Sequence, residues 1–238
     1  MRKNDEAPAS HEIEIEDTNA PCRIFLIRHG ETDWNKNFRY QGVSDVELND
    51  AGLEQARRVA LRLARTAPTR VYSSPLARAR RTAEVIMEHN AGGAPIELCG
   101  DIREVSFGSW EGITLPEVKR LYPEILAAWS ATPFSATPPG GEAFEDVASR
   151  ARRAAALIKG ARKPGEAVFV VAHGAVLRAL IAAMLDIGNM DVMWRMRIDN
   201  CSVSVIDAWE LRSSLLLLND THHARMDDGE IARLSFPS

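Results

Sequence analysis

Two histidines in the chain follow similar apolar stretches, and a glycine comes directly after each. His29-Gly30 lies just beyond the apolar run Ile24–Ile27. His173-Gly174 lies just beyond the similar run Val168–Val171. Short runs of this kind predict strands that are buried on both faces of a parallel sheet. If the two strands are parallel, both imidazoles leave the sheet at the same edge, where ligands of such sheets bind.

A pair of histidines at matched strand ends indicates a shared chemical site. A single histidine in this position is more often a packed or capping residue, and two such turns in one chain are hard to explain by packing. A metal site is a weaker alternative, because no H-x-H, H-x-x-x-H or nearby cysteine supplies a third ligand at a usual spacing. We therefore expect His29 and His173 to act without a metal.

Arginines occur where a helix disfavours positive charge. The helix expected after Ser74-Pro75 carries Arg78 in its first turn, followed by Arg80 and Arg81. Cations at a helix N-terminus oppose the helix dipole, whereas an anion bound there would reverse the sign of that effect. Arg28 adds a second fork-shaped donor suited to phosphate. We interpret Arg28 and Arg78 as anion ligands and the other two arginines as surface residues.

Strands and helices alternate along the chain around these residues. Strands are predicted at 24–27, 71–72, 168–171, 203–206 and 215–218, and helices at about 50–66, 74–89, 143–158 and 174–185. Ser74 and Pro75 are expected to cap and open the second helix, and Asn49 or Asp50 the first. The alternation predicts the α/β class: a three-layer α/β/α sandwich with a mainly parallel sheet and a late edge hairpin.

Length and composition limit the class of protein. The 238 residues are 45% hydrophobic, with a net charge of −4. This balance argues against a nucleic-acid binder or a polybasic membrane binder, although an acidic protein can still hold a locally basic pocket. We expect a single domain over residues 21–238 and a polar tail over residues 1–20. The alternating stretch 12–16 is an alternative edge strand within that tail.

The three cysteines indicate a reducing compartment. Cys22, Cys99 and Cys201 are far apart, and their odd number cannot be paired completely within one chain. We interpret them as reduced thiols of a cytoplasmic protein. The N-terminus has no apolar signal core, and no apolar run is long enough to span a bilayer.

Four segments together resemble the histidine phosphatase (phosphoglycerate mutase-like) superfamily. The first contains Arg28-His29-Gly30-Glu31-Thr32 and is similar to the family's R-H-G-E-T-x-W-N signature. The four segments are Leu26–Asn35, Ser73–Ala83, Arg103–Gly112 and Val171–Gly174, and they occur in the family's order. Together they extend over most of the chain beyond the tail.

The resemblance implies catalytic roles for five residues. His29 would attack phosphorus and become phosphohistidine. Arg28, Arg78 and His173 would surround the phosphoryl oxygens. Glu104 would protonate the leaving oxygen and then take a proton from the attacking water. Such a covalent intermediate divides a difficult displacement into two easier steps.

Further residues are implied as substrate contacts. Thr32, Asn35, Gln41 and Gly42 are expected in the substrate pocket. Phe107 and Trp110 either wall the leaving-group side or pack in the core. No cofactor is implied, since arginine and histidine supply the positive charge. The expected partner is a small phosphorylated metabolite, with no nucleic acid and no membrane.

The same site can serve a phosphatase or a mutase. We call Arg103–Gly112 the acid segment, because it carries Glu104. Cofactor-dependent phosphoglycerate mutases of the family carry a longer insertion after this segment, whereas Glu111-Gly112 leads quickly to Pro138–Glu142 here. This connection is more like that of the broad-specificity and α-ribazole phosphatases, so we expect a phosphomonoester hydrolase. Cofactor-dependent phosphoglycerate mutase is the alternative. A non-catalytic phospholigand-binding or scaffold protein is disfavoured, because all five core residues are present.

Two features are open on sequence grounds. The family's G-E-S tripeptide is Gly141-Glu142-Ala143 in this chain, so a hydroxyl at the start of that helix is missing. Residues 215–218 and Met193-Trp194 fit a homodimer interface or buried packing equally well. His222 and His223 are expected to have structural roles.

Overall fold

The computed structural model describes residues 20–131, 136–231 and 236. Its elements are β1 (Cys22–Arg28), α1 (Asp33–Lys36), α2 (Asp50–Leu63), β2 (Arg70–Ser73), α3 (Ala77–Glu88), β3 (Ile96–Leu98), α4 (Leu115–Leu121), α5 (Pro123–Ala131), α6 (Phe144–Gly160), β4 (Ala167–Ala172), α7 (Gly174–Met184), β5 (Val203–Ala208), β6 (Ser213–Asp220) and α8 (Asp228–Ile231). The stretch 12–16, with its alternative edge strand, lies outside the described residues.

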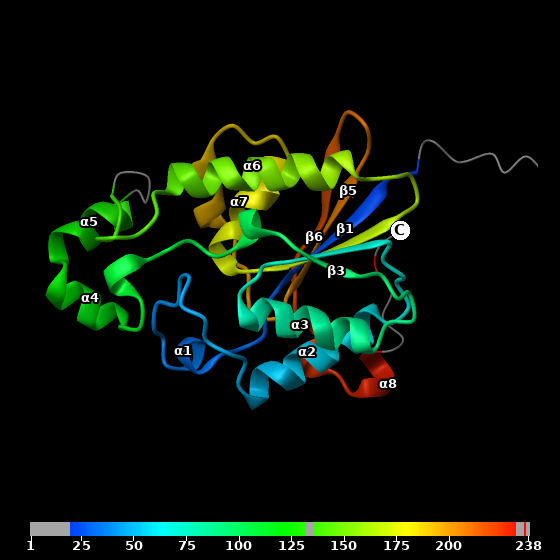
Figure 1. Ribbon diagram of the computed structural model, residues 1–238, viewed down its shortest axis with the longest axis horizontal. Coiled ribbons are helices and arrows are strands. Elements are labelled where there is room, and N and C mark those ends of the chain that lie inside the picture. The colour runs from blue at the N-terminus through cyan, green and yellow to red at the C-terminus, as the bar shows by residue number, and fades with distance from the viewer. Residues whose placement is uncertain (1–19, 132–135, 232–235, 237–238) are drawn as a thin grey trace, which may run out of the picture.

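A six-stranded sheet forms the middle of three layers. The strand order is β3-β2-β4-β1-β5-β6, and the first four strands are parallel. β5 is antiparallel to β1 and forms an edge hairpin with β6. Figure 1 shows α6 and α7 on one face of the sheet, and α2, α3 and α8 on the other. The expected α/β/α sandwich with a mainly parallel sheet is confirmed.

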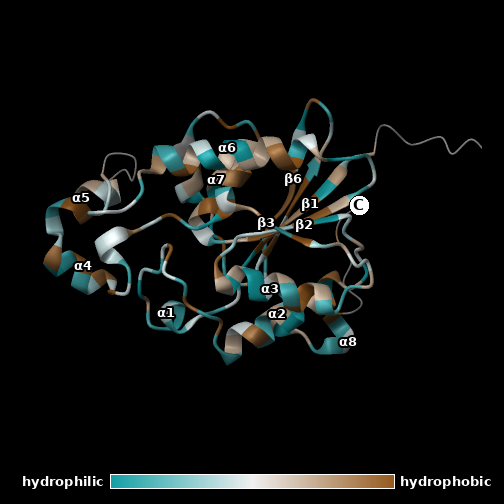
Figure 2. Ribbon diagram, in the orientation of Figure 1, coloured by the Kyte–Doolittle hydropathy of each residue, from teal (hydrophilic) through white to brown (hydrophobic). Residues whose placement is uncertain are grey.

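The central strands are buried on both faces, as their continuous apolar runs predict. Ile24 and Leu26 of β1 pack in the cluster that includes α6 and α7. Phe25 and Ile27 pack in the cluster that includes α2 and α3, where the rings of Phe25 and Phe169 meet edge to face at 5.3 Å. Figure 2 shows the hydrophobic strands between the two helical layers. Burying each such side chain contributes about 1.5–3 kcal/mol.

The register of β1 and β4 sets the position of both histidines. Arg28, the last residue of β1, lies opposite Ala172, the last residue of β4. The next residue in each strand's direction is a histidine, and the His29 amide still donates to the Ala172 carbonyl at 3.0 Å. Both imidazoles therefore leave the carboxyl edge of the sheet side by side, as predicted.

The predicted start of α3 is wrong. Neither Ser74 caps this helix nor Pro75 opens it, because α3 begins at Ala77 with Leu76 as a cap residue that makes no side-chain hydrogen bond. The Ser74 hydroxyl lies instead 2.7 Å from a ring nitrogen of His173. The expected Asn49 cap of α2 is confirmed, since its side chain accepts from Gly52 at 2.8 Å.

The connection between the acid segment and α6 contains two helices that we did not predict. Figure 1 shows α4 and α5 beyond the end of the sheet. Thr114 and Glu117 form a capping box that begins α4. Trp129 of α5 packs against Trp110 with ring centroids 5.6 Å apart. Among the described helices, none has the length and apolar character needed to cross a membrane.

A substitution at Gly52 would test how closely the turn after β1 packs on α2. A Cβ at this position would lie 2.1 Å from the Glu31 carbonyl oxygen. Alanine is otherwise preferred in a helix, so any loss reports the clash. We expect Gly52→Ala to lower the free energy of unfolding by roughly 1–3 kcal/mol in chemical denaturation. Gly160→Ala is the control, because its Cβ would meet nothing within 4 Å. Equal stability of both variants would contradict the close packing.

Candidate active site

The turn after β1 holds His29 in one tautomer. The side chain is buried, and its Nδ1 lies 2.7 Å from the Gly30 carbonyl oxygen. Because a carbonyl only accepts, Nδ1 carries the proton and Nε2 keeps its lone pair. The Asn200 amide donates to the carbonyls of His29 and Gly30 at 3.0 and 3.2 Å, and the Gly30 amide donates to the Thr82 hydroxyl at 3.1 Å. These bonds hold the turn from both sides.

His173 lies beside His29 with its ring fully buried. The two ring centroids are 5.0 Å apart, and the rings are inclined by 56°. Its Nε2 is 2.7 Å from the Ser74 hydroxyl, which also accepts from the Leu76 amide at 3.3 Å. We assign the hydroxyl proton to the bond with Nε2, which leaves Nδ1–H as the donor on the other side of the ring. This Nδ1 has no hydrogen-bond partner among the described residues.

Arg28 and Arg78 bring positive charge to the same place. Arg78 is completely buried and donates to the carbonyls of Ser44 and Gly42 at 2.9 and 2.7 Å. Arg28 donates to the Ile198 carbonyl at 2.7 Å. Within the described part of the chain, neither guanidinium forms an ion pair with a carboxylate. Two cations held by neutral acceptors create a site that favours an anion.

These cations keep both imidazoles neutral. Burial lowers the pKa of His29 well below its usual 6.5, and the charges of Arg78 and Arg28 lower it further. The pKa of His173 is also well below 6.5, because of burial first and then of Arg78 and His29. Burial lowers the pKa of Arg78 to about 10, so this side chain stays protonated at neutral pH. The His29 lone pair is thus available beside fixed positive charge.

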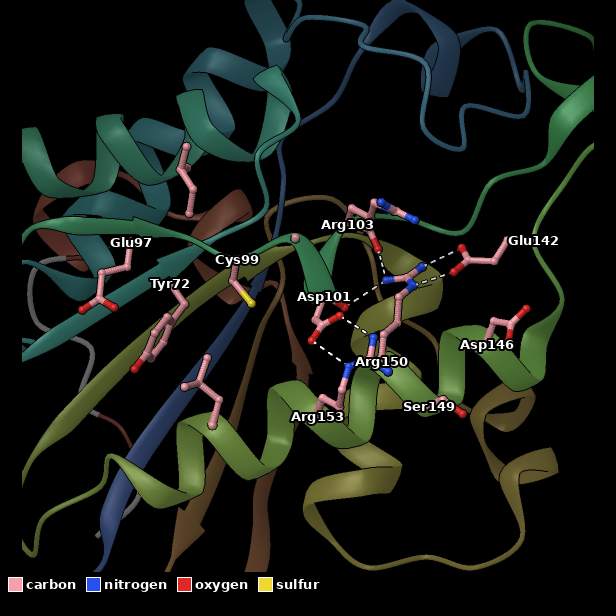
Figure 3. Close-up of a pocket in the computed structure, with 13 residues that line it drawn as sticks. Tyr72, Glu97, Cys99, Asp101, Arg103, Glu142, Asp146, Ser149, Arg150 and Arg153 are labelled. Carbon is pink, nitrogen blue, oxygen red and sulfur yellow. Dashed lines mark hydrogen bonds and ion pairs between the residues drawn. The ribbon is translucent and has the colours of Figure 1, made fainter.

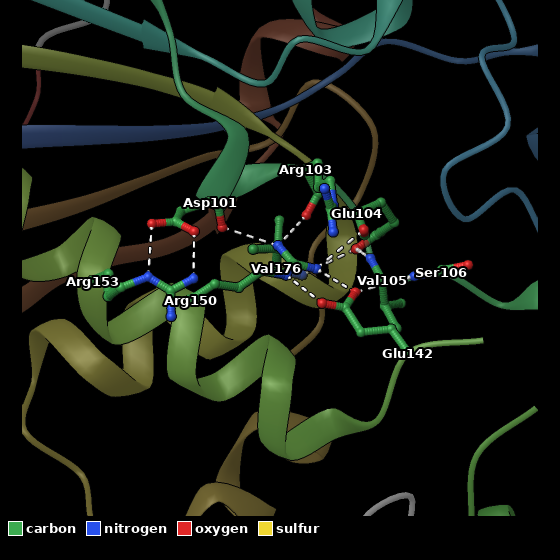
Figure 4. Close-up of polar contacts among 9 residues, drawn as sticks. All are labelled: Asp101, Arg103, Glu104, Val105, Ser106, Glu142, Arg150, Arg153 and Val176. Carbon is green, nitrogen blue, oxygen red and sulfur yellow. Dashed lines mark hydrogen bonds and ion pairs between the residues drawn. The ribbon is translucent and has the colours of Figure 1, made fainter. Parts of the chain in front are cut away.

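The side chain of Glu104 reaches the first turn of α7, next to the histidines and arginines described above. Its carboxylate accepts from the amides of Ala175 and Val176 at 3.2 and 3.1 Å, and from that of Val105 at 3.1 Å. Figure 4 shows Glu104 beside Val105 and Val176. Since α7 begins directly after His173, the carboxyl group is held close to the second histidine. The structure therefore brings together all five residues predicted as catalytic: His29, Glu104, His173, Arg28 and Arg78.

Two of the predicted substrate contacts stabilise the start of α1. Thr32 is completely buried, and its hydroxyl accepts from the Asn35 amide at 3.2 Å. The Asn35 side-chain oxygen accepts in turn from the amide of Thr32 and from Asn200, both at 3.2 Å. Contact of Thr32 and Asn35 with substrate stays a prediction, while their capping role is plain.

Gln41 and Gly42 lie on the loop that Arg78 holds. Gln41 is 7% exposed, and its side-chain oxygen has no partner within the described ranges. Gly42 has a left-handed φ of 56°, and a Cβ there would lie 2.1 Å from a Glu111 carboxylate oxygen. Glu111 binds this loop through the amides of Val43 and Ser44 at 3.1 and 2.9 Å. Contact of Gln41 and Gly42 with substrate stays a prediction, and the bonds of this loop to Glu111 were not predicted.

The two aromatic candidates differ in position. Trp110 is fully buried, with Tyr40 and Trp129 at 5.4 and 5.6 Å between ring centroids. Of the two alternatives for Trp110, packing in the core agrees with this burial. Phe107 is half-buried and lies 5.0 Å from Tyr40. Among the described residues, no group of three or more His, Cys, Asp or Glu is arranged to hold a metal ion.

Three residues of the site were missed in the sequence. Ser74 follows the end of β2 as His29 follows β1, so the strand-end rule applied to β2 would have found it. Thr82 lies one turn after Arg78 and accepts from Gly30, and its signal is only this spacing. Asn200 comes from a loop before β5 and carries no sequence signal that we recognise.

Comparisons with known proteins agree with this arrangement. The model of the histidine phosphatase superfamily (branch 1) matches residues 24–221. Phosphoserine phosphatase 1 of Hydrogenobacter thermophilus is 34% identical over 84% of the chain and 93% of its own length. The metal-independent phosphoserine phosphatase of Arabidopsis thaliana is 36% identical over 83% of the chain and 80% of its own length. The crystal structure of the α-ribazole phosphatase of Shigella flexneri matches with a TM-score of 0.77 at 29% identity. The match covers 83% of this chain and 96% of that one.

The bond from Ser74 to His173 generates a prediction for stability and activity. Ser74→Ala leaves a buried ring nitrogen unpaired, and we expect it to lower the free energy of unfolding by about 1–3 kcal/mol. Turnover of a phosphate ester should also fall, because the His173 ring loses the hydrogen bond that fixes its tautomer. Ser73→Ala is the matched control, since Ser73 is equally buried but donates only to the Ser74 carbonyl. Equal activity of the two variants would contradict the tautomer assignment.

The two neutral histidines predict a loss of stability in mild acid. Their folded-state pKa lies below the unfolded value of about 6.5, so the unfolded chain alone takes up protons as the pH falls through that value. We expect the free energy of unfolding to decrease by up to about 1.4 kcal/mol per pH unit for each histidine. Denaturation at pH 7 and pH 5 in a phosphate-free buffer measures this.

Removing one of these histidines should flatten the pH dependence. His173→Gln is expected to lose less stability than the wild type between the two pH values. A core variant such as Val168→Ala is the control, and its stability should be lowered equally at both. If His173→Gln keeps the wild-type slope, this histidine does not remain neutral on folding.

Proposed function

The chain belongs to the histidine phosphatase superfamily (branch 1), and from this premise we propose that it hydrolyses small phosphate monoesters through a phosphohistidine at His29. One observation carries the proposal. The unprotonated Nε2 of His29 lies beside a second buried imidazole and near two guanidinium groups that pair with no carboxylate of the described ranges. Such a group can attack phosphorus while the fixed donors receive the phosphoryl oxygens.

In the first step, the lone pair of His29 Nε2 forms a bond to phosphorus. The bond from phosphorus to the ester oxygen breaks, and its electron pair goes to that oxygen. Protonated Glu104 supplies the proton, so that the leaving group departs as a neutral alcohol. Donation from Nδ1 of His29 to the Gly30 carbonyl at 2.7 Å stabilises the positive charge that develops on the ring.

In the second step, water attacks phosphorus from the side that the alcohol has left. The Glu104 carboxylate takes a proton from this water, and the bond between Nε2 and phosphorus breaks. Phosphate leaves, His29 regains its lone pair, and Glu104 is again protonated. Water and ester are thus consumed, and alcohol and phosphate are produced.

The charges of the site match this chemistry without a metal. Arg28, Arg78 and the Nδ1–H of His173 provide donors for a phosphoryl group that spreads negative charge over its oxygens. The metal-independent phosphoserine phosphatase among the relatives supports the same reading. Thr32, Asn35, Gln41 and Gly42 are proposed to contact the substrate around this group.

The relatives support hydrolysis and a small metabolite as substrate. Two are phosphoserine phosphatases and one is an α-ribazole phosphatase. We propose a phosphorylated hydroxyl compound of similar size, with water in preference to a second hydroxyl as phosphoryl acceptor. The three cysteines are free thiols, which fits the proposed cytoplasmic location. A homodimer stays a prediction.

His29→Ala tests the proposed nucleophile. We expect hydrolysis of p-nitrophenyl phosphate to fall by about 10⁴-fold or more, because no other group can form the covalent intermediate. Wild-type protein quenched during turnover should carry an acid-labile phosphoryl group in intact-protein mass spectrometry, and the variant should not. Near-wild-type turnover by the variant would sink the proposal.

Two further measurements separate this reaction from its alternatives. A chelator should leave turnover unchanged, because no step needs a metal. With phosphoglycerate and a bisphosphoglycerate primer, we expect release of free phosphate and no isomerised product. Isomerisation faster than phosphate release would identify the protein as a mutase.

A further inference from the structure

A hollow of about 690 Å³ lies behind the segment that carries Glu104, between β3 and α6. Its lining includes Asp101, Arg103 and Arg150, and neither histidine of the site. Figure 3 shows Arg150 pointing from α6 across this hollow toward the segment, with Glu142 on its far side. The hollow is thus lined by residues that contact the acid segment, and it is separate from the phosphate site.

Arg150 uses its guanidinium on backbone carbonyls. It is 4% exposed, and it donates to the carbonyl oxygens of Asp101 at 3.0 Å, of Arg103, and of Glu104 at 3.1 Å. A guanidinium has five N–H donors in a rigid plane. Here three of them bind one short stretch of chain, and the other two bind the Glu142 carboxylate. Figure 4 shows these bonds converging on the residues around Glu104.

Glu142 completes the support on the other side of Glu104. Its carboxylate binds Arg150 at 2.8 and 3.0 Å and accepts from the Ser106 amide at 3.3 Å. Its own amide donates to the Ser106 carbonyl at 2.9 Å. The pair therefore binds the backbone before and after Glu104, and the carboxylate neutralises the buried cation.

We propose that Arg150, paired with Glu142, is a positioning residue that sets where the Glu104 carboxyl meets the leaving oxygen. The inference rests on the proposed function, in which Glu104 is the acid. α7 holds the Glu104 carboxylate through two amides, whereas Arg150 holds its backbone from α6. The carboxylate end of the side chain is thus restrained by α7, and its backbone end by α6.

A role in acid positioning has a signature that general support of the fold lacks. Proton donation matters most when the leaving group is a strongly basic alkoxide and least when it is a stable phenolate. The ratio of kcat/KM for glycerol phosphate to that for dinitrophenyl phosphate therefore reports the acid alone. A loss of folded protein or of phosphate binding lowers both values equally and leaves the ratio unchanged.

The test compares Arg150→Lys with Glu104→Gln. We expect Glu104→Gln to lower the ratio by about 100-fold, a usual contribution of a general acid. Arg150→Lys keeps the charge but presents a single ammonium, and we expect it to lower the ratio by about 10-fold or more. In the Glu104→Gln background, Arg150→Lys should not change the ratio further, because the two residues act through one proton transfer.

Arg153→Lys is the matched control. Arg153 lies on the same helix and binds the Asp101 carboxylate at 2.7 Å, but makes no bond to the carbonyls of the acid segment within the described residues. We expect its ratio to equal that of the wild type. Glu142→Gln gives a second variant if Arg150→Lys does not fold, and it should lower the ratio in the same direction.

The outcomes distinguish the inference from the proposed function. If Glu104→Gln lowers the ratio and the variants of Arg150 and Glu142 do not, the positioning role is wrong and the function stands. If Arg150→Lys lowers the ratio equally with and without Glu104, it acts by another route and the inference is also wrong. If Glu104→Gln leaves the ratio unchanged, Glu104 is not the acid, and both proposals fall.

Discussion

The site depends on two guanidinium groups, buried Arg78 and half-buried Arg28, that have no carboxylate partner in the described part of the chain. Burying a charge is costly unless it is paired, and Arg28 and Arg78 have only neutral carbonyls as acceptors among the described residues. Burial lowers the pKa of both His29 and His173, and the charges of the two arginines lower it further, so the imidazoles stay neutral. In the proposed reaction a bound phosphoryl group would balance these charges, and the same charges add to the effect of burial that keeps His29 unprotonated.

The sheet makes this arrangement possible. β1 and β4 are neighbours in parallel register, so the residues after Arg28 and Ala172 leave the sheet together. A shift by one residue would send each following side chain to the opposite face. The burial of Phe25 and Leu26 in different clusters on opposite faces opposes such a shift. The positions of the histidines are therefore stabilised by apolar side chains several residues away.

The sequence predicted the features that depend on local pattern. Buried strands follow from apolar runs, and both histidines follow from the rule for strand ends. The start of α3 was wrong because the Ser74 hydroxyl bonds to His173, far away along the chain. α5 was not predicted, since its apolar residues do not gather on one face and Trp129 is held by rings from other segments. Arg150 was missed because three of its bonds go to backbone carbonyls, which no sequence pattern marks, and its pairing with Glu142 has no characteristic spacing.

In the proposed function, phosphate binding and acid catalysis fall to different parts of the structure. The phosphoryl donors follow strand ends or the first turn of α3, and the strand positions are restrained by the register. In the proposed reaction the leaving group meets Glu104, whose segment is not part of the sheet. The acid segment is held instead by Arg150 and Glu142. A substitution that weakens the bonds of Arg150 and Glu142 is therefore expected to displace Glu104 while the residues at the strand ends keep their positions.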